Sequence, residues 1–128
     1  MQRVIHRFTI FYVIVLTLLL ELPIDPPEFV EDFGGPLVRH AHIITFTLLG
    51  FLVELGRNKA SMRFWVSILL LYAIGTDVLQ WLLHPICHRC FDLYDILNNI
   101  VGVFLGTLIG HFCRPLVIEP NKSLDKKE

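Results

Sequence analysis

Four apolar stretches, each long enough to cross a lipid bilayer as a helix, limit what this chain can fold into. Among its 128 residues, the stretches cover positions 4–22, 37–55, 64–83 and 93–112. About 20 helical residues span the hydrocarbon core, where every backbone group must be hydrogen-bonded within the protein. The connections are short, so consecutive helices should be antiparallel neighbours. The sequence therefore predicts an all-α, integral membrane four-helix bundle in residues 1–113 and a polar tail in residues 114–128.

The composition supports a membrane protein and excludes two other classes. Hydrophobic residues make up 54% of the chain and charged residues 18%, whereas soluble domains carry about 25% charged residues. The formal net charge of −1 argues against a nucleic-acid partner, which would require a basic surface. High hydrophobicity with low net charge also excludes an intrinsically disordered chain. We therefore expect membrane lipids, and no nucleic acid, as partners.

The basic residues predict how the bundle is oriented. Nine of the eleven lysines and arginines lie in the two termini or between the second and third stretches: Arg3, Arg7, Arg57, Lys59, Arg63, Arg114, Lys122, Lys126 and Lys127. Lysine and arginine accumulate on the cytoplasmic side of membrane proteins. Both termini are therefore predicted to face the cytoplasm. No small-residue cleavage site follows the first stretch, so it is interpreted as a retained first span.

Polar residues interrupt the last two stretches at similar depths. Asp77 and Gln80 share one face of the third stretch. Asp95 and Asn99 share one face of the fourth. Folding these two stretches into a hairpin brings Asp77 level with Asn98. An ionised aspartate at the centre of a membrane helix costs about 2.5–3.5 kcal/mol, so these carboxylates require partners.

Three further polar groups come from the same side of the membrane. Arg39 and His42 lie near the start of the second stretch, and Arg89 lies in the connection before the fourth. Together the polar groups predict an outward-facing pocket between the second, third and fourth stretches, in which the arginines hold an anionic group. The alternative is that these side chains only hold the helices together by hydrogen bonds. On the inner side, Glu54 is expected to extend to the membrane surface.

Small residues follow one face of the fourth stretch. Gly102, Gly106 and Gly110 recur at intervals of four, so they share one side of a helix. Such a stripe predicts close packing against another helix, either within the bundle or in a homodimer. By contrast, the prolines and glycines of residues 23–36 predict an irregular external connection.

Two cysteines, Cys87 and Cys90, form a C-x-x-C segment in the external connection, with His84 and His88 beside them. This spacing is compatible with a redox-active disulfide in an oxidising compartment, and incidental thiols are the other interpretation. Four potential ligands within seven residues cannot easily close a tetrahedral zinc site, so no metal and no cofactor are predicted. Cys113, at the cytoplasmic end, is expected to be reduced.

The spaced polar residues resemble the signature of the VanZ-like family. In chain order the motif reads Arg39-x2-His42, Asp77-x2-Gln80, Arg89 and Asp95-x3-Asn99-x2-Gly102-x3-Gly106. The resemblance covers about residues 38–110. It departs from the family at Val38, where an acidic residue is common, and the C-x-x-C segment is not part of the family pattern.

This resemblance implies a small multi-pass protein of the bacterial cytoplasmic (inner) membrane, in a family named after a member linked to teicoplanin resistance. It implies that the binding residues are His42, Asp77, Gln80, Arg89, Asp95, Asn99 and Arg39. The favoured function is binding of a lipid head group or of an amphipathic envelope molecule, rather than catalysis. Two alternatives are a thiol–disulfide oxidoreductase that uses Cys87 and Cys90, and a small dimeric transporter.

Overall fold

A computed structural model describes residues 2–21, 28–57, 61–83 and 93–118, and all regular secondary structure in these ranges is helical. The helices are α1 (Gln2–Glu21), α2 (Glu28–Gly56), α3 (Met62–Leu82) and α5 (Leu93–Ile118). Ser61 caps the start of α3, where its side chain accepts a hydrogen bond from the Phe64 backbone N–H at 3.3 Å. The all-α architecture predicted from the sequence is confirmed.

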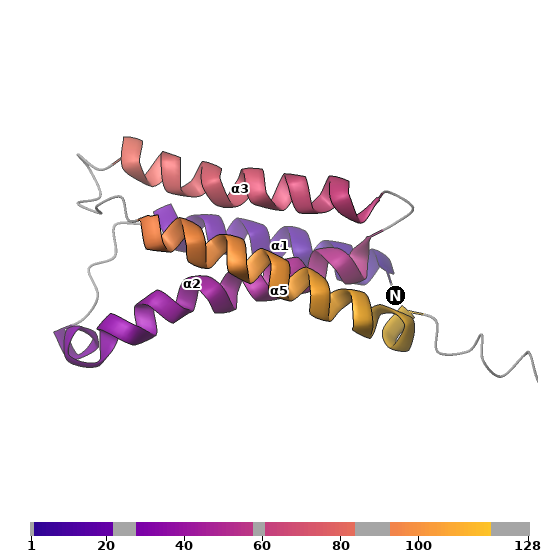
Figure 1. The fold of residues 1–128 in the computed structure, drawn as a ribbon, viewed down its shortest axis with the longest axis horizontal. Helices are drawn as coiled ribbons and strands as arrows, with labels where there is room; N and C mark the ends of the chain where they lie inside the picture. Colours follow the sequence, from indigo (N-terminus) through magenta and orange to yellow (C-terminus); the bar gives the residue numbers. More distant parts are fainter. Residues whose placement is uncertain (1, 22–27, 58–60, 84–92, 119–128) are drawn as a thin grey trace, which may run out of the picture.

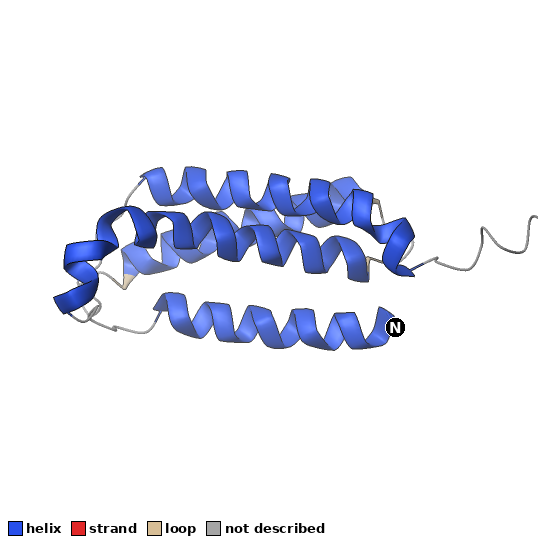
Figure 2. Ribbon diagram, turned by 90° about the horizontal axis from the view of Figure 1, so that it is seen from below, coloured by secondary structure: helices blue, strands red, loops and turns tan. Residues whose placement is uncertain are grey.

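The four helices run alternately up and down as a bundle (Figures 1 and 2). α1 begins and α5 finishes at the same end of the bundle, where α2 also finishes and α3 begins. We call this the basic end, because its helix ends carry Arg3, Arg7, Arg57, Arg63 and Arg114. The first and last described residues thus lie on one side, which is the arrangement that the predicted orientation requires.

The outer surface of the bundle is apolar. Large hydrophobic side chains such as Phe11, Leu71 and Phe104 are exposed on α1, α3 and α5, an arrangement that water-soluble bundles avoid. Among the described helices, α1, α3 and α5 are long and apolar enough to cross a membrane, and α2 contributes a shorter apolar segment, His40–Gly56. The predicted integral membrane bundle is confirmed, and the chain is a multi-pass membrane protein.

A small core connects the four helices, and its buried residues are Leu16, Phe46, Leu49, Leu69, Ala73 and Val103. The ring of Tyr72 on α3 packs against Phe46 on α2, with the two ring centroids 6.0 Å apart. The Tyr72 hydroxyl also shares a hydrogen bond of 2.8 Å with the Thr17 hydroxyl on α1. Tyr12 on α1 donates to the Thr45 carbonyl on α2 at 3.0 Å. Polar contacts therefore help to attach α1 to both of its neighbours.

The closest packing in the bundle is between α2 and α5, along what we call the glycine seam: Gly50, Gly102, Gly106 and Gly110. A Cβ atom on Gly102 would lie 2.7 Å from the carbonyl oxygen of Ile43. A Cβ atom on Gly106 would overlap the carbonyl oxygen of Thr47. Because a side chain does not fit at these positions, glycine allows the two backbones to approach. The predicted close-packing face is confirmed, and the helix it packs against is α2.

Two helices extend beyond the predicted spans. α2 begins at Glu28 rather than at residue 37, and it therefore includes Pro36 within the segment expected to be irregular. Its first turns are angled away from the rest of the helix (Figure 1), as bends at proline and glycine commonly are. α5 continues through Pro115 to Ile118. Arg114 attaches this end to the end of α2 by donating to the Arg57 carbonyl at 2.6 Å.

Candidate functional site

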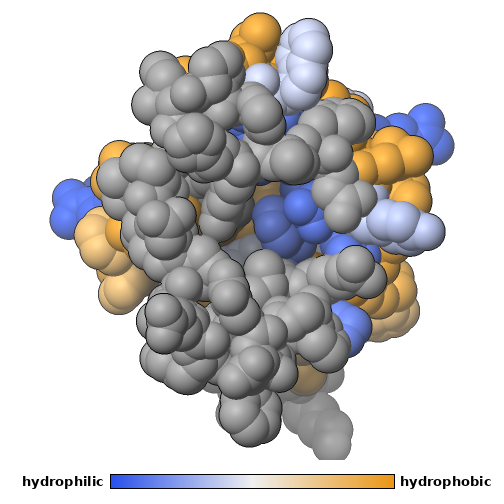
Figure 3. All heavy atoms as spheres, turned by 90° about the vertical axis from the view of Figure 1, so that its left-hand side faces the viewer, coloured by the Kyte–Doolittle hydropathy of each residue, from blue (hydrophilic) through white to orange (hydrophobic). Residues whose placement is uncertain are grey.

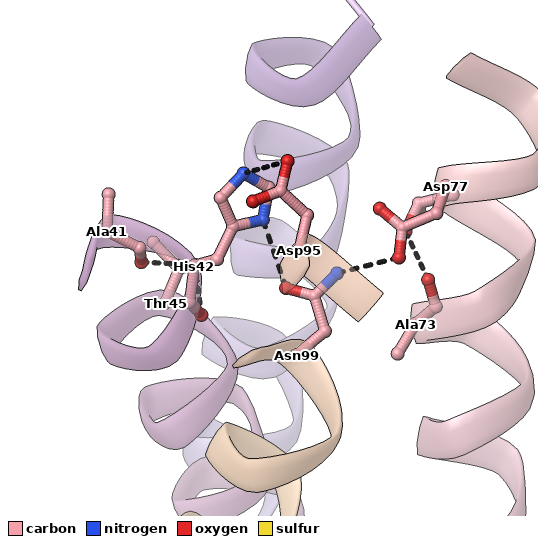
Figure 4. Close-up of polar contacts among 8 residues, drawn as sticks. Ala41, His42, Thr45, Ala73, Asp77, Asp95 and Asn99 are labelled. Carbon is pink, nitrogen blue, oxygen red and sulfur yellow. Dashed lines mark hydrogen bonds and ion pairs between the residues drawn. The ribbon is translucent and has the colours of Figure 1, made fainter. Parts of the chain in front are cut away.

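A hydrogen bond between two membrane helices forms the first part of the site. His42 on α2 and Asn99 on α5 are joined through Nδ1 and Oδ1, which lie 3.0 Å apart (Figure 4). Asn99 is 0% exposed. It follows that the carboxamide depends on protein groups for its hydrogen bonds, since a buried amide without partners is costly.

The same carboxamide continues the chain of hydrogen bonds to a third helix. Asn99 Nδ2 donates to Asp77 Oδ2 on α3 at 3.0 Å, and Asp77 is only 5% exposed. An ionised carboxylate only accepts hydrogen bonds, so the NH₂ group of Asn99 must face it. The oxygen of Asn99 is then left to accept, and His42 must donate from Nδ1–H. The network thus fixes which nitrogen of the imidazole carries a proton.

A second carboxylate faces the other nitrogen of the imidazole. Asp95 Oδ2 on α5 lies 4.0 Å from His42 Nε2, and the two side chains are 29% and 12% exposed. Asp95 thus approaches the ring nitrogen that does not face Asn99. We call His42, Asp77, Asp95 and Asn99 the polar network.

The polar network lies toward the end of the bundle opposite the basic end. Asp77 is five residues before the last residue of α3, and Asn99 is six residues after the first residue of α5. At 1.5 Å per residue, they lie about 7.5 Å and 9 Å inside these helix ends. Viewed from this end, hydrophilic atoms are visible near the centre of the molecule (Figure 3). The more exposed carboxylate, Asp95, is also the one nearer the end.

The remaining predicted site residues are less fully described. Gln80 is half-buried and lies one turn from Asp77 on α3. Arg39 lies one turn before His42 in α2, but its side chain is outside the described part of the structure. Arg89, Cys87 and Cys90 also lie outside the described residues. Within the ranges that the structure describes, no group of three or more His, Cys, Asp and Glu residues is placed to hold a metal ion.

A second polar cluster, which was not predicted from the sequence, occupies the basic end. Glu54 on α2 is 1% exposed, so the expectation that it extends to the membrane surface is wrong. Arg57 donates to both of its carboxylate oxygens, through Nε at 2.9 Å and Nη2 at 2.8 Å. His111 and Arg114 of α5 approach the same carboxylate to within 3.5 Å and 3.9 Å. We call these four residues the Glu54 cluster.

The glycine seam explains why Glu54 is enclosed. A Cβ atom on Gly110 would lie 2.9 Å from Cβ of Glu54. Glycine at position 110 therefore lets α5 cover the Glu54 side chain, whereas a larger residue there would hold the two helices apart. The spacing of three residues between Glu54 and Arg57 was a signal for this pairing. The approach of Arg114 to Glu54 could not be predicted without knowing how α5 packs against α2. The cluster therefore joins the end of α2 to the end of α5.

Comparison with known proteins gives one match. A family model described as VanZ/LLP1 matches residues 23–114, a range that contains the polar network, the glycine seam and the Glu54 cluster. No curated protein and no solved structure matches the chain. The family match thus includes every residue of the polar network and of the Glu54 cluster.

Proposed function

Because the chain belongs to the VanZ/LLP1 family, we propose that the polar network forms the floor of an outward-facing pocket. The pocket binds the polar head group of a lipid, or of another amphipathic molecule of the cell envelope, while the apolar part of that molecule stays in the bilayer. The protein acts in the bacterial cytoplasmic membrane, with both termini in the cytoplasm. It acts by binding rather than by catalysis.

The observation that carries this proposal is the unequal burial of the two carboxylates. Asp77 is buried and already accepts a hydrogen bond from Asn99. Asp95 is 29% exposed and lies at the limit of an ion pair with His42, at 4.0 Å. A network that only held helices together would have no need of a second, partly exposed carboxylate beside a buried one. The Asp95 carboxylate is accessible to the hydroxyl or ammonium groups of a ligand.

The chemistry of the ligand follows from charge. The polar network offers carboxylate oxygens, which accept hydrogen bonds from hydroxyl groups and attract ammonium groups. Arg39 and Arg89 supply the opposite charge and bind phosphate or carboxylate through charge-assisted hydrogen bonds. A zwitterionic or hydroxylated phosphate head group matches both halves. Teicoplanin resistance is a physiological outcome that this binding would serve, because the antibiotic carries an acyl chain and acts outside the membrane.

Two neighbouring histidines on α2 provide a matched test. His42 belongs to the polar network, whereas His40 is exposed and lies only two residues away. We expect native mass spectrometry of protein purified from bacterial membranes to detect a bound lipid in the parent and in His40→Ala. The same adduct should be lost in His42→Ala and in Asp95→Asn. Equal lipid occupancy in all four proteins would contradict the proposal.

A second arm tests the physiological outcome separately. In cells that express the parent or His40→Ala at equal levels, the inhibitory concentration of teicoplanin should rise relative to cells with an empty vector. His42→Ala should abolish the increase. If lipid binding follows the expected pattern and the inhibitory concentration does not change in any strain, the pocket binds a ligand but the link to resistance is wrong.

A further inference from the structure

Two adjoining hollows open on the α1 side of the basic end. The first, with a volume of about 410 Å³, is lined by Gln2, Arg3, His6, Arg7 and Gly56. The second, with a volume of about 330 Å³, lies between α1 and α3 above α2. His6 lines both hollows. They therefore adjoin at this residue, and together they run from the basic end toward the middle of the bundle.

The first hollow is positively charged. Arg3 and Arg7 are exposed, and within the described ranges neither forms an ion pair with an acidic side chain. Glu54 is the acidic residue nearest to Gly56 in the sequence, and its carboxylate is already bound to Arg57. Two exposed arginines side by side at a membrane surface attract an anion.

The second hollow is almost entirely apolar. Ile10, Val13 and Ile14 line it from α1, and Leu49 and Val53 line it from α2; the α3 residues are Trp65, Ile68, Leu69 and Tyr72. It lies alongside the helices, so a flexible hydrocarbon chain parallel to them would fit its shape. Burial of such a chain in contact with these side chains is favourable through dispersion contacts and lipid packing.

One polar atom beside the apolar hollow lacks a partner. Trp65 Nε1 is buried, and it makes no hydrogen bond within the described part of the chain. Buried donors without acceptors are rare in native proteins. Trp65 lies in the first turn of α3, the depth at which tryptophan side chains meet the head-group region of a bilayer. Trp65 therefore marks the level at which the charged part of a lipid gives way to its acyl chains.

We propose that the two hollows together bind an anionic phospholipid. Its phosphate lies between Arg3 and Arg7, and one acyl chain lies along α1 and α3 in contact with Trp65. The hollows present cations first and then an apolar wall, which is the order of the charged and apolar parts of such a lipid. This site lies at the basic end, away from the polar network, and does not depend on the binding function proposed above.

The two tryptophans of the chain allow a direct test. In Trp81→Phe, Trp65 is the only tryptophan, so its fluorescence reports on this site alone. The purified protein is placed in vesicles in which either phosphatidylglycerol or phosphatidylcholine carries bromine atoms on its acyl chains, at equal mole fractions. Bromine quenches tryptophan by contact. We expect brominated phosphatidylglycerol to quench Trp65 more strongly than brominated phosphatidylcholine does, by an apparent affinity ratio of about 25-fold, which is about fivefold for each of the two arginines.

Single-charge variants provide the matched control. Arg3→Gln and Arg7→Gln should each reduce the preference for phosphatidylglycerol by about fivefold, the contribution of one arginine beside an anionic surface. Arg63→Gln removes an exposed arginine from the same end, outside both hollows, and should leave the preference unchanged. The reverse variant, Trp65→Phe with Trp81 retained, should be quenched equally by both lipids.

Three results would overturn the proposal. The first is equal quenching of Trp65 by the two lipids in the parent. The second is a preference that Arg63→Gln lowers as much as Arg3→Gln and Arg7→Gln do, since this would be a general surface-charge effect. The third is protection of Trp65 from both lipids together with a dimer in native mass spectrometry, which would assign the apolar hollow to a second copy of the chain.

Discussion

His42 and Asn99 are joined across α2 and α5 by a hydrogen bond of 3.0 Å in which the direction of donation is determined by a third residue. Asn99 uses its NH₂ group on Asp77, so its oxygen accepts and the imidazole donates. A buried amide that bonds to two other helices stabilises the bundle by more than either hydrogen bond alone, because its loss leaves two partners without a hydrogen bond. Double-mutant cycles can therefore distinguish coupled hydrogen bonds in this network from independent packing contacts.

Replacing Asn99 by leucine should destabilise the bundle through the carboxylate that it leaves behind. Asp77 would lose its hydrogen bond while remaining buried, at a cost of about 1.5–3 kcal/mol. The double variant Asp77→Leu/Asn99→Leu should cost much less than the two single changes added together, because no unpaired charge remains. Unfolding in mixed micelles with increasing sodium dodecyl sulfate measures these differences. Additive losses would show that the two side chains are not coupled.

Two glycines offer a matched pair for testing the packing of α5 on α2. Gly106→Ala should destabilise the protein by about 1–3 kcal/mol, because its Cβ atom would overlap the Thr47 carbonyl. At Gly75 on α3, an added Cβ would meet nothing within 4 Å, so Gly75→Ala should be neutral or stabilising. The same micelle titration compares them. Similar effects at both positions would mean that the glycine seam does not limit the approach of the helices.

Neutralising Glu54 should be costly even though the change is small. Glu54→Gln leaves Arg57 and Arg114 facing each other without the carboxylate between them, and loss of one member of a buried ion pair costs about 3–5 kcal/mol. The double variant Glu54→Gln/Arg57→Gln should recover part of this loss. Arg63→Gln, an exposed position at the same end, is the control and should change stability little. A mild effect of Glu54→Gln would place the carboxylate in contact with water.

The chain's own cysteines can establish its orientation. Cys113 lies on α5 near the basic end, whereas Cys87 and Cys90 belong to the connection at the other end. In intact spheroplasts, a membrane-impermeant maleimide should label a variant that retains only Cys87, and should label a Cys113-only variant only after lysis. The opposite pattern would place both termini outside. Labelling of both in lysed cells controls for reactivity.

Cys87 and Cys90 also distinguish binding from thiol–disulfide chemistry. If the protein acts through the polar network, Cys90→Ser should retain both the lipid adduct and any effect on teicoplanin sensitivity. If it is an oxidoreductase, Cys90→Ser should abolish its activity, and the Cys87–Cys90 pair should change redox state in cells. Acid quenching followed by thiol trapping measures that state. A pair that cycles, together with an inactive Cys90→Ser, would replace the binding proposal.

Much of the fold could be predicted because a membrane restricts the choices. Apolar stretches of helical length must be helices, and the polar faces of α3 and α5 could be found from spacing alone. The hairpin placed Asp77 level with Asn98, whereas the hydrogen bond goes to Asn99. The predicted depth of the partner of Asp77 along the helix axis was thus correct to within one residue. The choice between two adjacent amides depends on rotation about the helix axis, which chain position alone fixes only roughly.

Other features depend on helices that are distant in sequence. Glu54 was expected at the surface because, on α2 alone, it is a charged residue near a helix end. Its burial is caused by α5, which approaches at Gly110 and brings Arg114. The two hollows beside His6 likewise depend on how α1, α2 and α3 pack together. Sequence patterns describe the faces of single helices, and they do not specify which faces will meet.

The glycine seam has a consequence for how the protein is made. The two helices that fit most closely, α2 and α5, are not neighbours in the chain, and α5 is synthesised after α3. Until it leaves the ribosome and enters the bilayer, His42 and Glu54 lack the groups from α5 that accompany them in the finished bundle. Nascent chains that stop before α5 thus expose two ionisable groups to lipid or to the insertion machinery. The polar network and the Glu54 cluster are therefore complete only when α5 is in place.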